Sequence, residues 1–145
     1  QIACGLYCCI ANDLMNGATL QDAIDSAALV LKNWYGLREE FVPWISEFDF
    51  LNAETLAALP EEAIKSSGYV VDTLQAALWC LITNRSYHDC MLKAVNLGYD
   101  TDTVAAVAGG VAGILYGAES IPEDWLYVLA KKEEIIRLCE NFLPA

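Results

Sequence analysis

Hydrophobic residues recur every three to four positions along most of this chain, which is the spacing of amphipathic α-helices. The spacing predicts helices over seven segments, namely 2–15, 20–34, 70–83, 86–96, 102–117, 123–130 and 131–142. No segment alternates apolar and polar residues as a strand would, and the Asn-Gly pair at 16–17 separates two helical segments. The sequence therefore predicts an all-α fold.

Residues 37–67 interrupt this helical pattern. Thr19 is expected to cap the second helix and Gly36 to end it, and the pattern that follows breaks into short pieces around two prolines. Acidic residues are scattered there among three aromatic ones, Trp44, Phe48 and Phe50. We expect this segment to be a surface excursion.

The helix expected over 102–117 is unusually rich in small residues. Gly109, Gly110 and Gly113 each cost about 1 kcal/mol of helix propensity relative to alanine. Because small side chains allow neighbouring helices to approach closely, we expect this helix to lie at the centre of the fold and to pack on several sides.

The sequence Asp-Thr-Asp-Thr at 100–103 places two carboxylates and a hydroxyl at the head of that helix. Such oxygens are the ligands that hard cations like Mg²⁺ and Mn²⁺ select. Residues two apart in an α-helix point about 200° away from each other, so Asp100 and Asp102 converge only outside a regular helix. We expect Gly98 to turn the chain, Asp100 to lie in the loop, and Asp102 or Thr103 to cap the helix. The same residues also fit a plain helix cap that binds no metal.

Two segments of the chain resemble one known family. The run 94–117, with its Asp-Thr-Asp-Thr core and small-residue helix, resembles the C-terminal metal motif of the ADP-ribosylglycohydrolases. The run 66–81 resembles the segment that precedes this motif in the same family. One departure is Tyr99, where family members commonly have a second glycine.

The resemblance implies a compact orthogonal helical bundle, of which residues 1–145 form the C-terminal part of a single domain. It also implies a binuclear Mg²⁺ or Mn²⁺ site shared with an N-terminal half that is absent from the chain. Asp100, Asp102 and Thr103 would be metal ligands. Gly68, Tyr69 and Val70 would line the ADP-ribose pocket, although Tyr69 fits an ordinary half-buried aromatic equally well. The catalytic acidic residue is expected in the absent half, so the chain alone is expected to be inactive.

The implied function is hydrolysis of the glycosidic bond that joins ADP-ribose to a protein side chain or a small acceptor. The implied partners are an ADP-ribosylated protein or small conjugate, and the missing half or another chain that covers the exposed core. Two alternatives stay open. One is an inactive relative that binds ADP-ribose or has a structural role, and the other is a separate helical interaction module.

The net charge and the hydropathy of the chain limit the classes of partner that it could bind. A net charge of −12 argues against nucleic acid and an anionic membrane surface, since both are negative. The uncharged run 103–118 falls short of the ~20 residues that a membrane span needs. Hydrophobic residues make up 56% of the chain, with a mean hydropathy of +0.33, so exposed apolar surface is expected where another half would pack.

The remaining chemistry-bearing residues have simple interpretations. Asp72 is expected to cap a helix that begins at Thr73, and His88 to lie on a helix surface. The six cysteines lie mostly on apolar helical faces without a C-x-x-C pair, which favours reduced, buried thiols in a cytoplasmic protein. They are Cys4, Cys8, Cys9, Cys80, Cys90 and Cys139.

Overall fold

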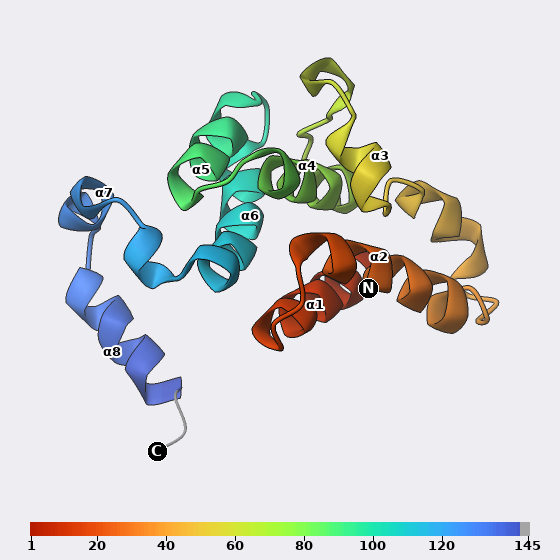
Figure 1. The fold of residues 1–145 in the computed structure, drawn as a ribbon, viewed down its shortest axis with the longest axis horizontal. Coiled ribbons are helices and arrows are strands. Elements are labelled where there is room, and N and C mark those ends of the chain that lie inside the picture. Colours follow the sequence, from red (N-terminus) through yellow and green to blue (C-terminus); the bar gives the residue numbers. More distant parts are fainter. Residues whose placement is uncertain (143–145) are drawn as a thin grey trace.

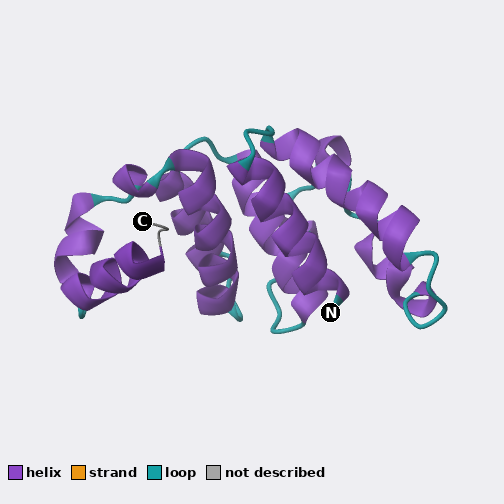
Figure 2. Ribbon diagram, turned by 90° about the horizontal axis from the view of Figure 1, so that it is seen from below, coloured by secondary structure: helices purple, strands orange, loops and turns teal. Residues whose placement is uncertain are grey.

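Helices provide the regular structure of residues 1–142, the part of the chain that this computed structural model describes. The α-helices are α1 (Ile2–Met15), α2 (Leu20–Val30), α3 (Ala53–Ala57), α4 (Val70–Thr83), α5 (Tyr87–Asn96), α6 (Thr101–Tyr116), α7 (Glu123–Val128) and α8 (Lys132–Phe142). No strand occurs among these residues, which confirms the predicted all-α fold. The helices form a curved row, with α7 and α8 at the end opposite α2 (Figures 1 and 2).

Short polar side chains begin several of these helices. The Thr19 hydroxyl accepts a hydrogen bond from the Asp22 main-chain N–H at 3.1 Å, as the sequence predicted. The Ser86 hydroxyl accepts one from Asp89 N–H at 3.0 Å at the start of α5. Each of these bonds satisfies a main-chain donor that the first helical turn leaves free.

The core lies where α1, α2, α4 and α6 meet. Leu6 and Ile10 of α1, Ile24 of α2, and Val104 and Val111 of α6 are completely buried. Helix α6 contacts α4, α5 and α1, so the small-residue helix is central, as predicted. A Cβ on Gly110 would lie 2.5 Å from the Tyr7 hydroxyl oxygen of α1, so the missing side chain permits this close approach.

Residues 37–67 are not the surface excursion that the sequence predicted. They form the 3₁₀ helix η2 (Val42–Phe48), then α3, then the 3₁₀ helix η3 (Glu61–Ala63). Several of their apolar side chains are buried, namely Phe48, Leu51, Leu56 and Ile64. The prediction was wrong because elements this short do not repeat long enough to show a helical period.

Hydrogen bonds also attach this segment to the core helices. The Asp25 carboxylate of α2 accepts a bond from Ala53 N–H at 3.0 Å, and the Trp79 indole of α4 donates to the Leu59 carbonyl at 3.0 Å. The end of α2 differs from expectation as well, since residues Leu31–Tyr35 widen into a single π-helical turn, η1, before Gly36.

The six cysteines differ in burial, and Cys9 is half-buried. Cys80 and Cys90 are buried, as predicted, and burial raises the pKa of each thiol to about 12. Cys4, Cys8 and Cys139 are exposed, so the prediction of buried thiols was wrong for these three. Their helical faces are apolar in the sequence but are not covered within residues 1–142. No helix in this part of the chain is long and apolar enough to cross a membrane.

Candidate functional site

The loop between α5 and α6 has two consecutive residues in the left-handed conformation. Gly98 has a φ of +87° and turns the chain, as the sequence predicted. Tyr99 follows with a φ of +61°, a region that glycine enters without steric cost and other residues rarely adopt. The Tyr99 side chain is 96% exposed, so tertiary packing does not explain its conformation.

Hydrogen bonds join this loop to the one that precedes α4. The Asp100 main-chain N–H donates to the Ser66 carbonyl at 3.0 Å, and the buried Ser66 hydroxyl donates to the Gly98 carbonyl at 2.6 Å. The two segments that carry the family resemblance therefore form one unit, although about thirty residues of α4 and α5 separate them in the chain.

Asp100 occupies the N-cap position of α6, but its side chain caps no main-chain N–H. A Cβ on Gly68 would lie 3.2 Å from the Asp100 Oδ2 oxygen, so the absence of a side chain at Gly68 gives this half-buried carboxylate its space. Asp100 is therefore held in place by main-chain bonds, while its carboxylate caps no N–H group of the helix.

Asp102 and Thr103 lie in the first turn of α6 and are exposed. Since the N-cap of α6 is Asp100, neither of them is the cap, and this part of the prediction was wrong by two to three residues. The oxygens of Asp100, Asp102 and Thr103 form a hard donor set of the kind that Mg²⁺ and Mn²⁺ prefer. Residues 1–142 contain no group of three or more His, Cys, Asp or Glu side chains that could hold a metal ion. A metal at this turn would need further ligands from outside the described residues.

The start of α4 is a compact turn built on Ser67. The Ser67 hydroxyl donates to the Asp72 carboxylate at 2.6 Å and accepts from the Tyr69 N–H at 3.1 Å. Helix α4 begins at Val70, the start of the predicted range 70–83, so Asp72 lies inside the first turn and the expectation that it caps a helix at Thr73 was wrong. Its carboxylate is used to fix the loop that carries Gly68.

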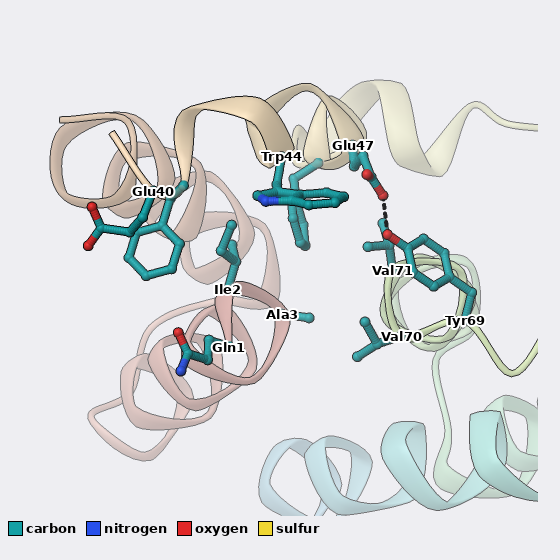
Figure 3. Close-up of a pocket in the computed structure, with 11 residues that line it drawn as sticks. Gln1, Ile2, Ala3, Glu40, Trp44, Glu47, Tyr69, Val70 and Val71 are labelled. Atoms are coloured by element: carbon teal, nitrogen blue, oxygen red, sulfur yellow. Dashed lines mark hydrogen bonds between the residues drawn. The ribbon is translucent and has the colours of Figure 1, made fainter. Parts of the chain in front are cut away.

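Tyr69 and Val70 line a pocket of about 400 Å³ between the start of α1, η2 and the start of α4 (Figure 3). The Tyr69 hydroxyl donates a hydrogen bond to the Glu47 carboxylate, and this bond raises the pKa of the phenol. Gly68 is not part of this pocket and lies against Asp100. The structure thus divides the predicted substrate residues between the Asp100 turn and the neighbouring pocket.

Most of the residues that line this pocket were not recognised as site residues from the sequence. Glu40, Trp44 and Glu47 come from the segment that was interpreted as a surface excursion. The signal that could have found them is the interleaving of acidic and aromatic residues over 39–50. Their position in the pocket depends on the fold, because residues from the starts of α1 and α4 and from η2 together line it.

A second, apolar pocket of about 370 Å³ lies between α1, α4 and α6. Its lining includes the exposed side chains of Cys4, Cys8 and Ala106, together with Tyr7 and Leu74. Exposed apolar surface of this kind is what the composition predicted for a face that another part of the protein would cover.

A family model described as ADP-ribosylglycohydrolase matches residues 1–145, and the chain belongs to this family. Among its relatives, the ADP-ribosylarginine hydrolase Tri1 of Serratia proteamaculans (strain 568) is 46% identical over 91 residues, which cover 63% of this chain and 25% of that protein. The ADP-ribosyl-[dinitrogen reductase] glycohydrolase of Rhodospirillum rubrum is 41% identical over 70 residues, covering 48% of this chain and 24% of that protein.

A mouse relative, ADP-ribosylhydrolase ARH3, is 30% identical over 79 residues, covering 45% of this chain and 21% of that protein. The chain thus spans about a quarter of the length of the curated relatives that it matches. The resemblance found in the two motifs is confirmed at the level of the family.

Proposed function

We propose that this chain is the metal-binding part of a hydrolase that removes ADP-ribose from a modified protein side chain or another acceptor by hydrolysis of the glycosidic bond. Membership of the ADP-ribosylglycohydrolase family and the activities for which its relatives are named support this reaction. The observation that carries the proposal is the Asp100 carboxylate, which does not cap the helix that it precedes. Main-chain hydrogen bonds hold this residue beside Gly68.

Asp100, Asp102 and Thr103 would hold Mg²⁺ or Mn²⁺ in a binuclear site whose other ligands come from a part of the protein outside this chain. A bound divalent ion supplies stabilisation of developing negative charge and activation of a water molecule. The half-buried position of Asp100 would fix the depth of the ion relative to the ribose. No residue of this chain is assigned as the catalytic acid or base.

The segment Gly68, Tyr69 and Val70 would contact the ADP-ribose. Gly68 permits close approach of a ligand to the main chain next to Asp100, and Tyr69 offers an exposed ring. The first turn of α4, whose N-terminal residues are exposed, presents main-chain N–H groups of the kind that bind diphosphates. This arrangement suits a chain in which basic residues are few.

The apolar pocket between α1, α4 and α6 would be covered by the remaining part of the same domain. Its exposed side chains are small or apolar, as expected for a surface that becomes core when the domain is complete. The absence of disulfides among the six cysteines, all of which lie within residues 1–142, supports the further proposal of a cytoplasmic location.

The proposal is tested by a chimaera in which this chain replaces the segment that it matches in the Serratia proteamaculans relative. We expect the chimaera to release ADP-ribose from an ADP-ribosylated protein in the presence of Mg²⁺ or Mn²⁺. Asp100→Asn should lower the rate by about 100-fold or more. Substitution of a residue that only hydrogen-bonds to a metal ligand already lowers metal affinity or activity by about 10-fold to 100-fold. Asp49→Asn, at an exposed position away from the turn, is the matched control and should leave the rate unchanged.

A folded chimaera that binds ADP-ribose but does not release it would favour the alternative of a non-catalytic, ADP-ribose-binding relative. Equal rates for Asp100→Asn and Asp49→Asn would contradict the assignment of Asp100 as a metal ligand.

A further inference from the structure

Ser66 and Thr73 are the buried serine and threonine residues of the described range 1–142, and both hold the loop that precedes α4. The Ser66 hydroxyl donates to the Gly98 carbonyl at 2.6 Å, and the Thr73 hydroxyl donates to the Ser67 carbonyl at 3.2 Å. A buried hydroxyl costs free energy unless it is hydrogen-bonded, and an alanine would fill the same place without that cost. Packing alone therefore does not explain a serine at position 66.

Two hydrogen bonds connect Ser66 to the two sides of Tyr99. The hydroxyl bond ends on Gly98, directly before Tyr99, and the Ser66 carbonyl accepts a bond from the Asp100 N–H, directly after it, at 3.0 Å. Because one residue holds both ends of this loop, the main chain has to bulge between them. These bonds account for the left-handed φ of +61° at Tyr99, whose side chain is exposed and does not pack against the core.

The same bonds fix the main chain of Asp100. Residues whose side chains cap a helix usually have an extended main chain. Thr19 and Ser86 cap α2 and α5 in this way, with ψ angles of 159° and 155°, whereas Asp100 has a ψ of 53°. The Asp100 carboxylate accordingly makes no cap bond, and a Cβ on Gly68 would lie 3.2 Å from its Oδ2 oxygen.

We propose that Ser66 is a positioning residue for the candidate metal turn. Its two bonds keep residues 98–100 in the form that places the Asp100 carboxylate beside Gly68 and away from the helix N–H groups. Ser66 is assigned no contact of its own with a metal or a substrate. Its importance for metal binding rests on the proposed function, whereas its hold on the loop does not.

The Ser66 hydroxyl would act by shifting the population of loop conformations. A hydrogen bond between neutral groups changes such an equilibrium by about 3-fold to 10-fold. A ligand that binds one conformation loses apparent affinity in proportion to the fraction of molecules in that conformation. Saturating ligand restores the conformation, so loss of the hydroxyl should lower metal affinity without lowering the rate at saturating metal. Asp100→Asn removes a ligand and should lower the rate at every metal concentration.

The test compares Ser66→Ala with a matched control, Ser120→Ala. The Ser120 hydroxyl also donates to a glycine carbonyl, that of Gly117, at 2.6 Å, but at the opposite end of α6. Hydrogen exchange of the Asp100 amide, measured by NMR in the 145-residue chain, reports the bond to the Ser66 carbonyl. Relative to the amides of α4, we expect exchange about 3-fold to 10-fold faster in Ser66→Ala and unchanged in Ser120→Ala.

Metal affinity is then measured by calorimetric titration of Mn²⁺ into the chimaera with the Serratia proteamaculans relative. We expect affinity about 3-fold to 10-fold weaker in Ser66→Ala than in Ser120→Ala, and rates within about 2-fold of each other at saturating Mn²⁺. Ser66→Thr retains the hydroxyl and should recover most of the affinity. Urea denaturation of each variant confirms that it is folded under the conditions used.

Equal exchange of the Asp100 amide with and without the Ser66 hydroxyl would overturn the proposal. So would equal Mn²⁺ affinity of the two alanine variants, or a rate in Ser66→Ala that stays low at saturating Mn²⁺. Faster exchange in Ser66→Ala, together with a folded chimaera that binds no Mn²⁺, would support the hold on the loop and reject the proposed function alone.

Discussion

Tyr99 is a single residue on which the shape of the candidate metal turn depends. It adopts a left-handed φ of +61° directly after Gly98, at a position where the family resemblance leads one to expect a second glycine. The turn thus keeps a glycine-like main-chain shape without the residue that usually supplies it. The structure gives the main-chain shape of this loop, whereas metal binding by the loop remains a prediction.

Tyr99→Gly should raise the free energy of unfolding by about 0.5–1 kcal/mol. A left-handed conformation costs about 1–2 kcal/mol for residues with a Cβ, and the greater freedom of glycine in the unfolded chain offsets part of that gain. The side chain is 96% exposed, so little packing is lost. Urea denaturation measures the change. Tyr99→Ala retains the Cβ and should give no gain, and an equal gain in both variants would show that the conformation is not the cause.

The exposed and buried cysteines should differ in reactivity. Iodoacetamide at pH 8 is expected to modify Cys4, Cys8 and Cys139 in the folded chain. Cys80 and Cys90 should stay unmodified, because burial raises the pKa of each to about 12 and blocks access. Mass spectrometry of peptides after timed alkylation gives the order of modification. Rapid modification of Cys90 in a sample shown to be folded would contradict the described core.

At the scale of elements, most helices could be predicted from the sequence and the segment 37–67 could not. Helices α1, α4, α5 and α6 are long enough for their apolar period to be read, and their observed ends fall within one or two residues of the prediction. By contrast η2, α3 and η3 span seven, five and three residues. Their burial depends on tertiary contacts, such as those of α3 with α2 and α4 and of η2 with η1.

Separation along the sequence likewise decides which features of the candidate site could be predicted. The candidate oxygen ligands Asp100, Asp102 and Thr103 lie within four consecutive positions, so they could be proposed without a structure. The pairing of Asp100 with Gly68, and of Tyr69 with Glu47, joins residues that are more than twenty positions apart. Such pairings follow from how the helices pack and could not be read from local spacing.

Helix α6 allows a direct test of why its glycines are tolerated. Gly110→Ala should lower the free energy of unfolding by about 1–3 kcal/mol, because the new Cβ would lie 2.5 Å from the Tyr7 hydroxyl. That hydroxyl donates to the Val107 carbonyl at 3.1 Å and could not move without losing the bond. Thermal or urea denaturation measures the loss.

Gly113→Ala is the matched control in the same helix. No atom lies within 4 Å of the position of its Cβ, so only helix propensity changes, and stability should rise by about 0.5–1 kcal/mol. If the two variants were equally destabilised, close packing of α6 on α1 would not be the reason for Gly110.

At the scale of the whole molecule, buried thiols and phenols should make the free energy of unfolding vary with pH in the alkaline range. Cys80 and Cys90 ionise with a pKa near 9 in the unfolded chain and near 12 in the folded one. The unfolded state therefore loses protons first, and the free energy of unfolding should fall as the pH rises from about 9 to 12. Burial also raises the pKa of Tyr7, Tyr87 and Tyr116, which acts in the same direction.

Urea denaturation at pH 8, 9 and 10 measures this slope. Cys90→Ala should make it shallower, since one of the groups that titrates on unfolding is removed. A stability that rises over this range would contradict the burial of these thiols.

The molecule also has an exposed apolar face between α1, α4 and α6, on the same helices that place the Asp100 turn. A chain that covers a quarter of its relatives' length and has three candidate oxygen ligands at this turn is expected to hold a metal weakly by itself. Affinity should appear once the rest of the domain supplies the remaining ligands.

The most direct measurement is a calorimetric titration of Mn²⁺ into the isolated chain and into the chimaera with the Serratia proteamaculans relative. We predict weak binding to the chain alone, at least about 10-fold tighter binding to the chimaera, and loss of that gain in Asp100→Ala and Asp102→Ala. A folded chimaera that binds no Mn²⁺, or that binds it equally well without both carboxylates, would show that the Asp-Thr-Asp-Thr turn only begins a helix.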